Sequence, residues 1–327
     1  MKKVVVTGAS GFIGKFLVPH LVKKGLSVKV LVRTFESDIF PSQVEQYIGD
    51  LTQPDTLKGL ANDIDWVFHL GGYAHAWQGE KEADLHQQVN LLGTQNLLNE
   101  CLRAGIKKFI YFSSIKAVGD TQQCIDESWD MQPTTHYGIA KREAEKQILA
   151  YNYIMDSCIL RLALVYGPGM KGNLYQMLGA IDKAHFPPIP PVNNQRSLVS
   201  VYDVCQAAYL AASQKCSNGR IYYVTDKESY STYQIYTYMR NALGKNKLNL
   251  YIPLWVFKMV AILGDKYEKW FRYRFPFNSQ TFDKLFLSAT CNSFRIQNEL
   301  GYKPEYSLKN VLPEIVETYR KIFQNLA

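Results

Sequence analysis

The sequence has no apolar run close to the roughly 20 residues that a membrane-spanning helix requires. The nearest candidate, YIPLWVFKMVAILG at 251–264, is interrupted by Lys258. We interpret it as a buried or lid helix, with a weak contact with a membrane surface as the alternative. The N-terminal MKKVVVTGASG has too few apolar residues before its glycines to be a signal peptide. We therefore expect a cytoplasmic protein with no integral membrane segment.

Cysteine and histidine are scarce and form no ligand pattern. None of the six cysteines belongs to a Cys-x-x-Cys pair, and the six histidines show no metal-ligand spacing. This argues against a disulfide framework and against a zinc module. We predict reduced, mostly buried thiols and no metal site.

The basic residues form no runs, although the formal net charge is +8. Zinc-finger spacing, an aromatic RNA-binding box and basic heptads are all missing, which argues against nucleic acid as a partner. A positive charge spread in this way suits a phosphorylated small molecule better.

Short apolar runs alternate with helical patterns through the first half of the sequence. We predict buried strands at KKVVVTG, SVKVLVR, VEQYIGD, DWVFHLGG, KKFIYFSS and SCILRLALVYG, and helices at 12–24, 84–104 and 137–151. This βαβ alternation predicts an α/β fold. Its core would be a Rossmann-type, doubly wound parallel sheet, joined to a smaller, mainly helical substrate-binding domain.

The length of 327 residues exceeds what one hydrophobic core usually organises, so we expect two domains. The dinucleotide-binding domain covers 1–166, and a strand and helix in LVSVYDVCQAAYLAAS, then RIYYVTD, return residues 198–226 to its sheet. The proline-rich stretch 183–197 cannot be a regular element. Residues 167–197 and 227–327 form the predicted substrate-binding domain.

Three glycines follow the first predicted strand and open the first predicted helix. Gly8, Gly11 and Gly14 permit a tight turn, a close approach of the backbone to a pyrophosphate, and close packing of the helix on the sheet. The N–H groups that begin the helix then face the phosphates. The pattern predicts a dinucleotide site.

Tyr137 and Lys141 lie four residues apart on a predicted helix and share one of its faces. Such a pair is also compatible with an ordinary packed or solvated face, and a second one occurs at Tyr223 and Lys227. That second pair lies at the end of a predicted strand, where four residues span about 13 Å. We predict that Tyr223 is a core residue, whereas Tyr137 and Lys141 carry out proton chemistry.

The glycine spacing and YGIAK together resemble the short-chain dehydrogenase/reductase superfamily. The chain resembles more narrowly its extended, NAD(P)-dependent epimerase/dehydratase members, because further motifs occur in their order: GDLTQPDTL, VFHLGG, VNLLGTQNLL, FIYFSSIKAVG, YGIAKREAE, VYGPGMKGNL and RSLVSVYDV. Among these it looks most like bacterial UDP-sugar 4-epimerases and UDP-4-keto-6-deoxy-N-acetylhexosamine 4-reductases.

This resemblance implies a catalytic group of Ser114, Tyr137 and Lys141, with Ser113 as the alternative serine. A phenol has an ordinary pKa of about 10, and a nearby lysine ammonium is expected to lower it. The serine hydroxyl would complete a pair of donors for the substrate oxygen. In the family the lysine also holds the ribose of the nicotinamide.

The second strand ends in Val32 and Arg33, where NAD-binding relatives place a carboxylate on the adenosine ribose. An arginine there can pair with a ribose phosphate, so we favour NADP(H), with NAD possible. Asp50 matches the family residue near the adenine. The complete set implied for the cofactor is Gly8, Ser10, Gly11, Phe12, Ile13, Gly14, Arg33, Asp50, Leu51, Leu70, Gly71, Gly72, Tyr137 and Lys141.

In sugar-nucleotide members of the family, the nucleotide diphosphate contacts segments that match Asn173, Leu174 and Arg196 here. The resemblance also implies that Ser114 and Tyr137 contact the sugar. We therefore expect the reduction of a UDP-4-keto-6-deoxy-N-acetylhexosamine in surface polysaccharide (O-antigen) synthesis. A reductase must release its spent cofactor, which suits NADPH, whereas an epimerase retains NAD. Family members commonly dimerise through the helices that flank the sheet, so a homodimer is expected.

Three alternatives remain open at the level of the sequence. The first is a UDP-hexose 4-epimerase that retains NAD. The second is a hydroxysteroid- or flavonol-type reductase of an apolar substrate, suggested by Trp255, Phe257, Trp270 and Phe271. The third is a catalytically silent, nucleotide-sensing protein of the same fold.

Overall fold

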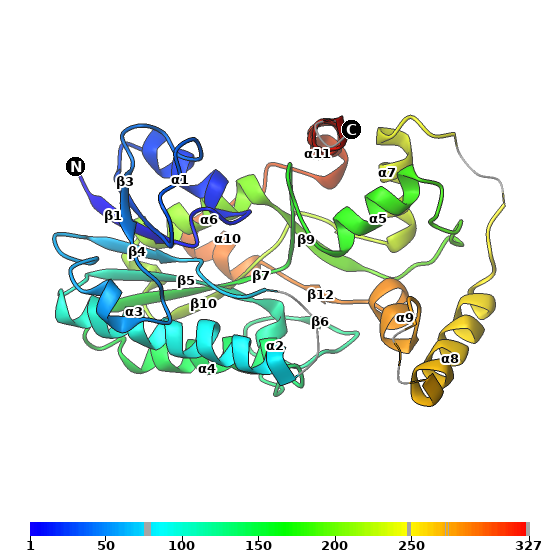
Figure 1. Ribbon diagram of the computed structural model, residues 1–327, viewed down its shortest axis with the longest axis horizontal. Coiled ribbons are helices and arrows are strands. Elements are labelled where there is room, and N and C mark those ends of the chain that lie inside the picture. The colour runs from blue at the N-terminus through cyan, green and yellow to red at the C-terminus, as the bar shows by residue number, and fades with distance from the viewer. Residues whose placement is uncertain (75–79, 247–249, 272, 274, 325–327) are drawn as a thin grey trace.

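The computed structural model describes residues 1–74, 80–246, 250–271, 273 and 275–324. Its largest element is a seven-stranded parallel sheet in the order β10-β7-β5-β4-β1-β2-β3 (Figure 1). The strands are β1 (Lys3–Thr7), β2 (Ser27–Val32), β3 (Glu45–Ile48), β4 (Trp66–His69), β5 (Lys108–Ser114), β7 (Asp156–Leu162) and β10 (Arg220–Val224). This confirms the predicted doubly wound sheet.

Helices cover both faces of this sheet. They include α1 (Gly14–Lys23), α2 (Glu80–Leu85), the π-helical segment η2 (His86–Leu92), α3 (Gly93–Arg103), α4 (His136–Ala150), α6 (Val201–Ser213) and α10 (Phe294–Leu300). Short 3-10 turns are η1 (Pro54–Leu57), η3 (Ile115–Ala117) and η4 (Lys215–Ser217). The predicted helix at 84–104 is therefore one continuous helical stretch whose middle is π-helical.

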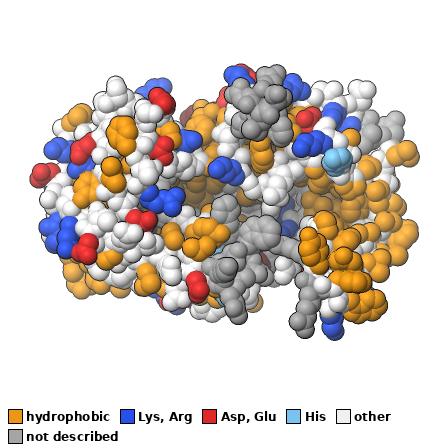
Figure 2. Space-filling model, viewed as in Figure 1, with side chains coloured by type: hydrophobic (Ala, Val, Ile, Leu, Met, Phe, Trp, Pro, Cys, Tyr) orange, Lys and Arg blue, Asp and Glu red, His pale blue; other side chains and the backbone are white. Residues whose placement is uncertain are grey.

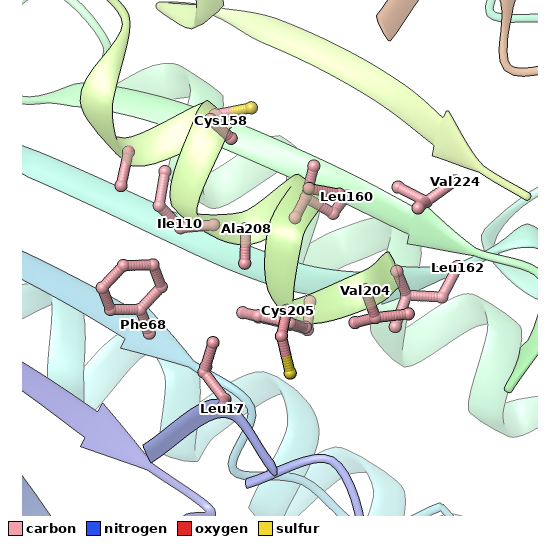
Figure 3. Close-up of a cluster of buried hydrophobic side chains, with 14 of the residues drawn as sticks. Leu17, Phe68, Ile110, Cys158, Leu160, Leu162, Val204, Cys205, Ala208 and Val224 are labelled. Carbon is pink, nitrogen blue, oxygen red and sulfur yellow. The ribbon is translucent and has the colours of Figure 1, made fainter. Parts of the chain in front are cut away.

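Successive residues of a strand face opposite sides of the sheet, and here both sides are buried. Val4 and Val6 enter the core beneath α1, α6 and α10, whereas Val5 enters the core beneath α3 and α4. In the first of these cores Leu17 packs with Phe68 and Cys205 (Figure 3). All six cysteines are free thiols, and four are buried: Cys101, Cys158, Cys205 and Cys291.

A smaller, separate sheet contains the strand that we expected to return to the large sheet. It contains β8 (Leu164–Tyr166), β9 (Arg196–Ser200) and β11 (Ser229–Tyr230), in the order β11-β9-β8. The prediction that the strand at 198–200 rejoins the large sheet is therefore wrong. Only α6 and β10 return, and β10 takes the edge position beside β7.

A buried carboxylate joins the small sheet to the end of β10. Asp226 accepts hydrogen bonds from the hydroxyls of Tyr166 at 2.7 Å and Tyr230 at 2.9 Å, and from the Ser200 amide at 3.0 Å. Burial raises the pKa of Asp226 to about 7, although these donors oppose the rise. One side chain thus satisfies polar groups on three strands.

The remaining helices surround a second hydrophobic core that contains Tyr166, Leu178, Leu198 and Leu312. These helices are α5 (Asn173–Asp182), α7 (Thr232–Ala242), α8 (Leu254–Phe271), α9 (Ser279–Phe286) and α11 (Leu308–Gln324). Figure 1 shows α5, α7, α8 and α9 at the end of the molecule away from β3, and α11 above its middle. Positions 247–249, 272, 274 and 325–327 of the predicted substrate-binding domain lie outside the described residues. The stretch 183–195 contains no helix or strand.

One segment of the predicted substrate-binding domain packs elsewhere. Ile296 and Leu300 of α10, together with Tyr302, belong to the first core beside the large sheet. A two-stranded parallel pairing of β6 (Cys124–Ile125) with β12 (Thr290–Cys291) lies next to this segment in the sequence. The two halves of the chain therefore share one core.

A buried ion pair fixes α4 to the sheet. Arg161 on β7 donates through Nη2 to Glu145 on α4 at 2.7 Å and through Nε at 3.0 Å, and both side chains are almost completely buried. Ser113 on β5 donates to the same carboxylate. Because Glu145 lies two helical turns after Tyr137, the pair sets the position of the whole helix face.

We predict that Glu145→Ala lowers the free energy of unfolding by about 3–5 kcal/mol, because it leaves the Arg161 guanidinium buried without a counterion. Urea denaturation measures the change. Glu143→Ala is the matched control, since its pair with Lys146 on the same helix is solvent-exposed and contributes about 1 kcal/mol or less. Equal losses in the two variants would contradict the prediction.

Candidate active site

The turns after β1 and β4 meet backbone to backbone. Gly8 has a φ of +67°, and a Cβ on it would lie 2.7 Å from the Gly71 nitrogen. A Cβ on Gly14 would lie 2.4 Å from the Gly8 carbonyl oxygen. Only glycine fits these contacts, so the cradle before α1 is made of main-chain atoms, as a pyrophosphate site requires. The exposed Ser10 and Gly11 and the partly buried Phe12 and Ile13 complete the turn.

Arg33 is exposed directly after β2, and Val32 before it is buried. Within the described part of the chain, Arg33 has no hydrogen bond or ion pair. Its guanidinium is therefore available to an anion. Asp50, after β3, accepts from the amide and the hydroxyl of Thr52, both at 2.8 Å through Oδ1. Leu51 is buried, and its Cδ1 would lie 2.6 Å from a Cβ on Gly71.

Ser114 and Tyr137 come together at the end of β5. The Ser114 hydroxyl accepts from the Lys116 amide at 3.2 Å, which leaves its proton free to donate, and it lies close enough to Tyr137 to act on the pKa of the phenol. Ser113 instead points into the ion pair beneath α4. Thr135 caps α4 by accepting from the Gly138 amide at 3.1 Å, which places Tyr137 in the first turn.

Lys141 lies under this pair but points elsewhere. Its Nζ donates to the Phe112 carbonyl at 2.9 Å and lies 4.5 Å from the centre of the Tyr111 ring. Burial lowers the pKa of Lys141 to about 8, against the opposing effect of the Glu145 carboxylate. A Cβ on Gly72 would lie 3.6 Å from Nζ, so the ammonium reaches the turn after β4.

The expected lowering of the tyrosine pKa by the lysine is not what the structure shows. Burial raises the pKa of Tyr137, and the nearby Ser114 hydroxyl opposes the rise. The physical reason is that the ammonium of Lys141 is directed towards a carbonyl oxygen rather than towards the phenol. At neutral pH the phenol therefore keeps its proton.

Sequence reasoning missed Asn90 and His86, which lie on the π-helical segment η2. Asn90 is buried and clamps the turn after β4, accepting from the Tyr73 amide at 2.7 Å and donating to its carbonyl at 2.9 Å. Its amide also contacts His86 Nδ1 at 3.1 Å. The His86 ring packs 5.5 Å from the Tyr137 ring, between centroids. The motif VNLLGTQNLL contained Asn90, but no spacing distinguished it from its neighbours.

A directed chain of hydrogen bonds runs behind the turn. Thr7 Oγ1 accepts from the Gly71 amide at 3.0 Å and contacts His69 Nδ1 at 2.7 Å. On the other side, His69 Nε2 lies 2.9 Å from Thr94 Oγ1, whose proton goes to the Asn90 carbonyl. Since Thr94 has only one proton, His69 must donate through Nε2 and accept at Nδ1. The strand histidine thus holds both ends of the turn.

The three residues proposed for the diphosphate contribute differently. Asn173 is exposed at the first position of α5, where free N–H groups point outward. The Leu174 side chain is buried in the second core, so only its backbone could contact a ligand. Arg196, at the start of β9, donates to the Leu287 carbonyl at 3.0 Å. No carboxylate lies within ion-pair distance of Arg196 among the described residues, and burial lowers its pKa.

The second Tyr-x-x-x-Lys pair behaves as predicted. Tyr223 is fully buried in the first core, and its hydroxyl contacts Arg161 Nη1 at 3.3 Å, whereas Lys227 is exposed. Within the described ranges, no group of three or more His, Cys, Asp or Glu side chains could hold a metal ion.

The sequence profile of the NAD dependent epimerase/dehydratase family matches residues 4–225. UDP-glucose 4-epimerase of Vibrio cholerae is 28% identical over 328 residues, which covers 97% of this chain and 95% of that protein. A 3 beta-hydroxysteroid dehydrogenase/Delta 5-->4-isomerase of Mycobacterium tuberculosis is 25% identical over 344 residues, covering 99% and 92%. The solved UDP-glucose 4-epimerase of Thermotoga maritima, with UDP-glucose, has a TM-score of 0.78 at 21% identity, covering 98% and 99%.

The sheet order and the glycine turn after β1, together with the family match, define an enzyme of the extended short-chain dehydrogenase/reductase class. The profile match covers more than half of the sequence, and the chain belongs to the NAD dependent epimerase/dehydratase family.

We predict that Gly138→Ala lowers nicotinamide-dependent turnover about 100-fold, the cost of a misplacement of about 1 Å. A Cβ there would lie 2.2 Å from the Lys116 carbonyl oxygen, so the start of α4 must move away from the turn that carries Ser114. Ile139→Ala, at the exposed neighbouring position, is the control and should keep its turnover. Unchanged turnover in Gly138→Ala would refute the argument.

We also predict that the His69 ring stays neutral, with its proton on Nε2, across about pH 5–8, where an ordinary histidine titrates. Burial lowers the pKa of His69 to about 3, with a smaller contribution from the Lys141 ammonium. The ¹⁵N chemical shifts of the ring, followed against added imidazole as a titration standard, check both statements. A titrating His69 signal, or a proton on Nδ1, would contradict them.

Proposed function

We propose that the protein transfers a hydride at C4 of a UDP-sugar, and that it reduces the 4-keto group of a UDP-4-keto-6-deoxy-N-acetylhexosamine in surface polysaccharide synthesis. The observation that carries this proposal is that Ser114 and Tyr137 lie next to each other, with Lys141 on the same face of α4, at the carboxyl edge of the sheet. Ligands of open parallel sheets bind at this edge, beside the point where the strand order reverses.

The residues at this edge fit a nicotinamide dinucleotide. The backbone cradle of Gly8, Gly14 and Gly71 has no room for a Cβ, which suits a pyrophosphate lying against main-chain N–H groups. Lys141 reaches the exposed Gly72, where the ribose of the nicotinamide would lie. When bound, the reduced cofactor supplies the hydride that becomes attached to C4.

The side chains supply the proton and the orientation. Tyr137 keeps its proton at neutral pH, and protonated phenol is the form that a ketone reduction consumes when the carbonyl oxygen becomes a hydroxyl. Ser114 has a free hydroxyl proton to hold that oxygen while negative charge develops on it. The phenolate left behind regains a proton from solvent after each turnover.

Arg196 and the start of α5 provide the anion site for the diphosphate. The Asp120 carboxylate acts on Arg196 only from beyond ion-pair distance, and a partly buried guanidinium without a closer carboxylate is costly unless an anion joins it. A planar guanidinium binds phosphate oxygens in pairs, which suits a nucleoside diphosphate better than an apolar substrate. Trp255, Trp270 and Phe271, which suggested an apolar substrate, are exposed rather than gathered into a pocket.

The choice between reductase and epimerase depends on the cofactor. Arg33 is exposed and unpaired, and Val32 brings no carboxylate that would repel a ribose phosphate, which favours NADP(H) and hence a cofactor that is released. The similarity to a UDP-glucose 4-epimerase favours the second candidate, a 4-epimerase that retains NAD.

The test is oxidation of NADPH or NADH by the purified protein with freshly generated UDP-4-keto-6-deoxy-N-acetylglucosamine. We expect turnover with NADPH preferred, and a loss of about 10²–10⁴-fold in Tyr137→Phe. Tyr153→Phe is the matched control, because this tyrosine is exposed far from the sheet edge and its loss should change nothing. Arg33→Ser should remove the preference for NADPH.

The opposite results are equally informative. Without turnover, a protein that retains NAD through purification and interconverts UDP-hexoses is an epimerase, and Arg33 then has no role in cofactor choice. Failure of UDP to bind, combined with reduction of a steroid or flavonol ketone, would overturn the nucleotide-sugar assignment.

A further inference from the structure

Helix α8 has two apolar faces on opposite sides. The inner face consists of Phe257, Ala261 and Gly264, which are buried, and it packs on residues 275–286. The ring of Phe257 lies 5.1 Å from that of Phe286, between centroids, and a Cβ on Gly264 would lie 2.3 Å from the Phe277 carbonyl oxygen. The inner face is thus covered by these residues, and this packing holds α8 in place.

The outer face is equally apolar but has no cover in the described structure. We call it the outer stripe: Trp255, Met259, Ile262, Leu263 and Trp270. Its members follow one another at helical spacing, two positions out of phase with the inner face, which puts them on the opposite side. Trp255 is 63% exposed, Leu263 58% and Trp270 78%. Figure 2 shows hydrophobic side chains gathered at this end of the molecule.

The charges of α8 are divided between its two sides. Both acidic side chains are engaged with the segment before and at the start of α9: Asp265 accepts from the Ser279 amide at 3.1 Å, and Glu268 from the Phe275 amide at 2.9 Å. The three lysines Lys258, Lys266 and Lys269 are exposed and have no ion-pair partner within the described ranges. The outer stripe is therefore apolar and rich in tryptophan, and the unpaired charges of the helix are all positive.

We propose that the outer stripe docks α8 in the plane of an anionic lipid membrane. Tryptophan and leucine inserted at the headgroup level, with lysines beside them, are the composition that such surface helices use. The protein's net charge of +8 adds attraction over a longer range. None of the described helices combines the length and hydropathy that a bilayer-spanning segment needs, so the contact is one of surface attachment.

A second copy of the chain fits this surface less well. A two-fold symmetric contact would place the lysines of α8 opposite the same lysines of the other copy. The two carboxylates of α8 that could compensate are already bonded to its own chain at Ser279 and Phe275. An anionic headgroup layer supplies the missing negative charge without this conflict.

The test is flotation of the full-length protein with vesicles of phosphatidylcholine alone or with added phosphatidylglycerol. We expect binding only to the anionic vesicles, weakened by salt, with a blue shift of tryptophan emission. Trp255→Ser with Trp270→Ser should abolish flotation. Lys266→Glu with Lys269→Glu should weaken binding at least 25-fold, at about fivefold for each lysine removed from an anionic surface.

Tyr153→Ser with Phe294→Ser is the matched control, because it removes two large exposed side chains away from α8. This control should float like the unaltered protein, and all variants should keep their circular dichroism spectra. Equal flotation with both kinds of vesicle, none with either, or no effect of the α8 substitutions would each overturn the proposal. So would sedimentation showing a lipid-free dimer that the tryptophan substitutions dissociate.

Discussion

The buried contact between Glu145 and Arg161 is the constraint on which the rest of the site depends. It ties α4 to β7 in a region closed to water, where an unpaired charge has a high cost. Tyr137, Lys141 and Glu145 lie on one face of α4 at successive turns, so fixing the last of them fixes the height and rotation of the other two. Ser113 joins the same carboxylate from β5, and its neighbour Ser114 lies near the phenol. One pair of charges thus sets the register between a helix and two strands.

Much of this arrangement could be predicted from local patterns. Buried parallel strands are continuous apolar runs, and all seven strands of the large sheet overlap predicted strand segments, although the edge strand β3 is only partly buried. The contrast between Tyr137 and Tyr223 was also visible, because the same spacing has a different meaning in a helix and at a strand end. What these positions have in common is that short-range sequence alone determines their geometry.

The remainder depends on contacts between distant segments. β9 has the composition of a sheet strand, but whether it pairs with the large sheet or with β8 is decided by the path of the chain after Tyr166. Asn90 acquires its role only because a π-helical turn presents it to Tyr73. The protonation of Tyr137 likewise depends on where the Lys141 ammonium points, and a carbonyl of β5 determines that direction. No spacing within the sequence encodes these three outcomes.

The shared core has a consequence for how the chain can be divided. The family profile ends at residue 225, yet Ile296, Leu300 and Tyr302 lie beyond that point and fill the core between α6 and β10. The Tyr302 hydroxyl donates to the carbonyl of Thr225 itself, at 3.1 Å. A chain truncated after residue 225 would therefore expose apolar core surface beside the edge strand β10. The segment matched by the family profile is therefore shorter than the segment that completes this hydrophobic core.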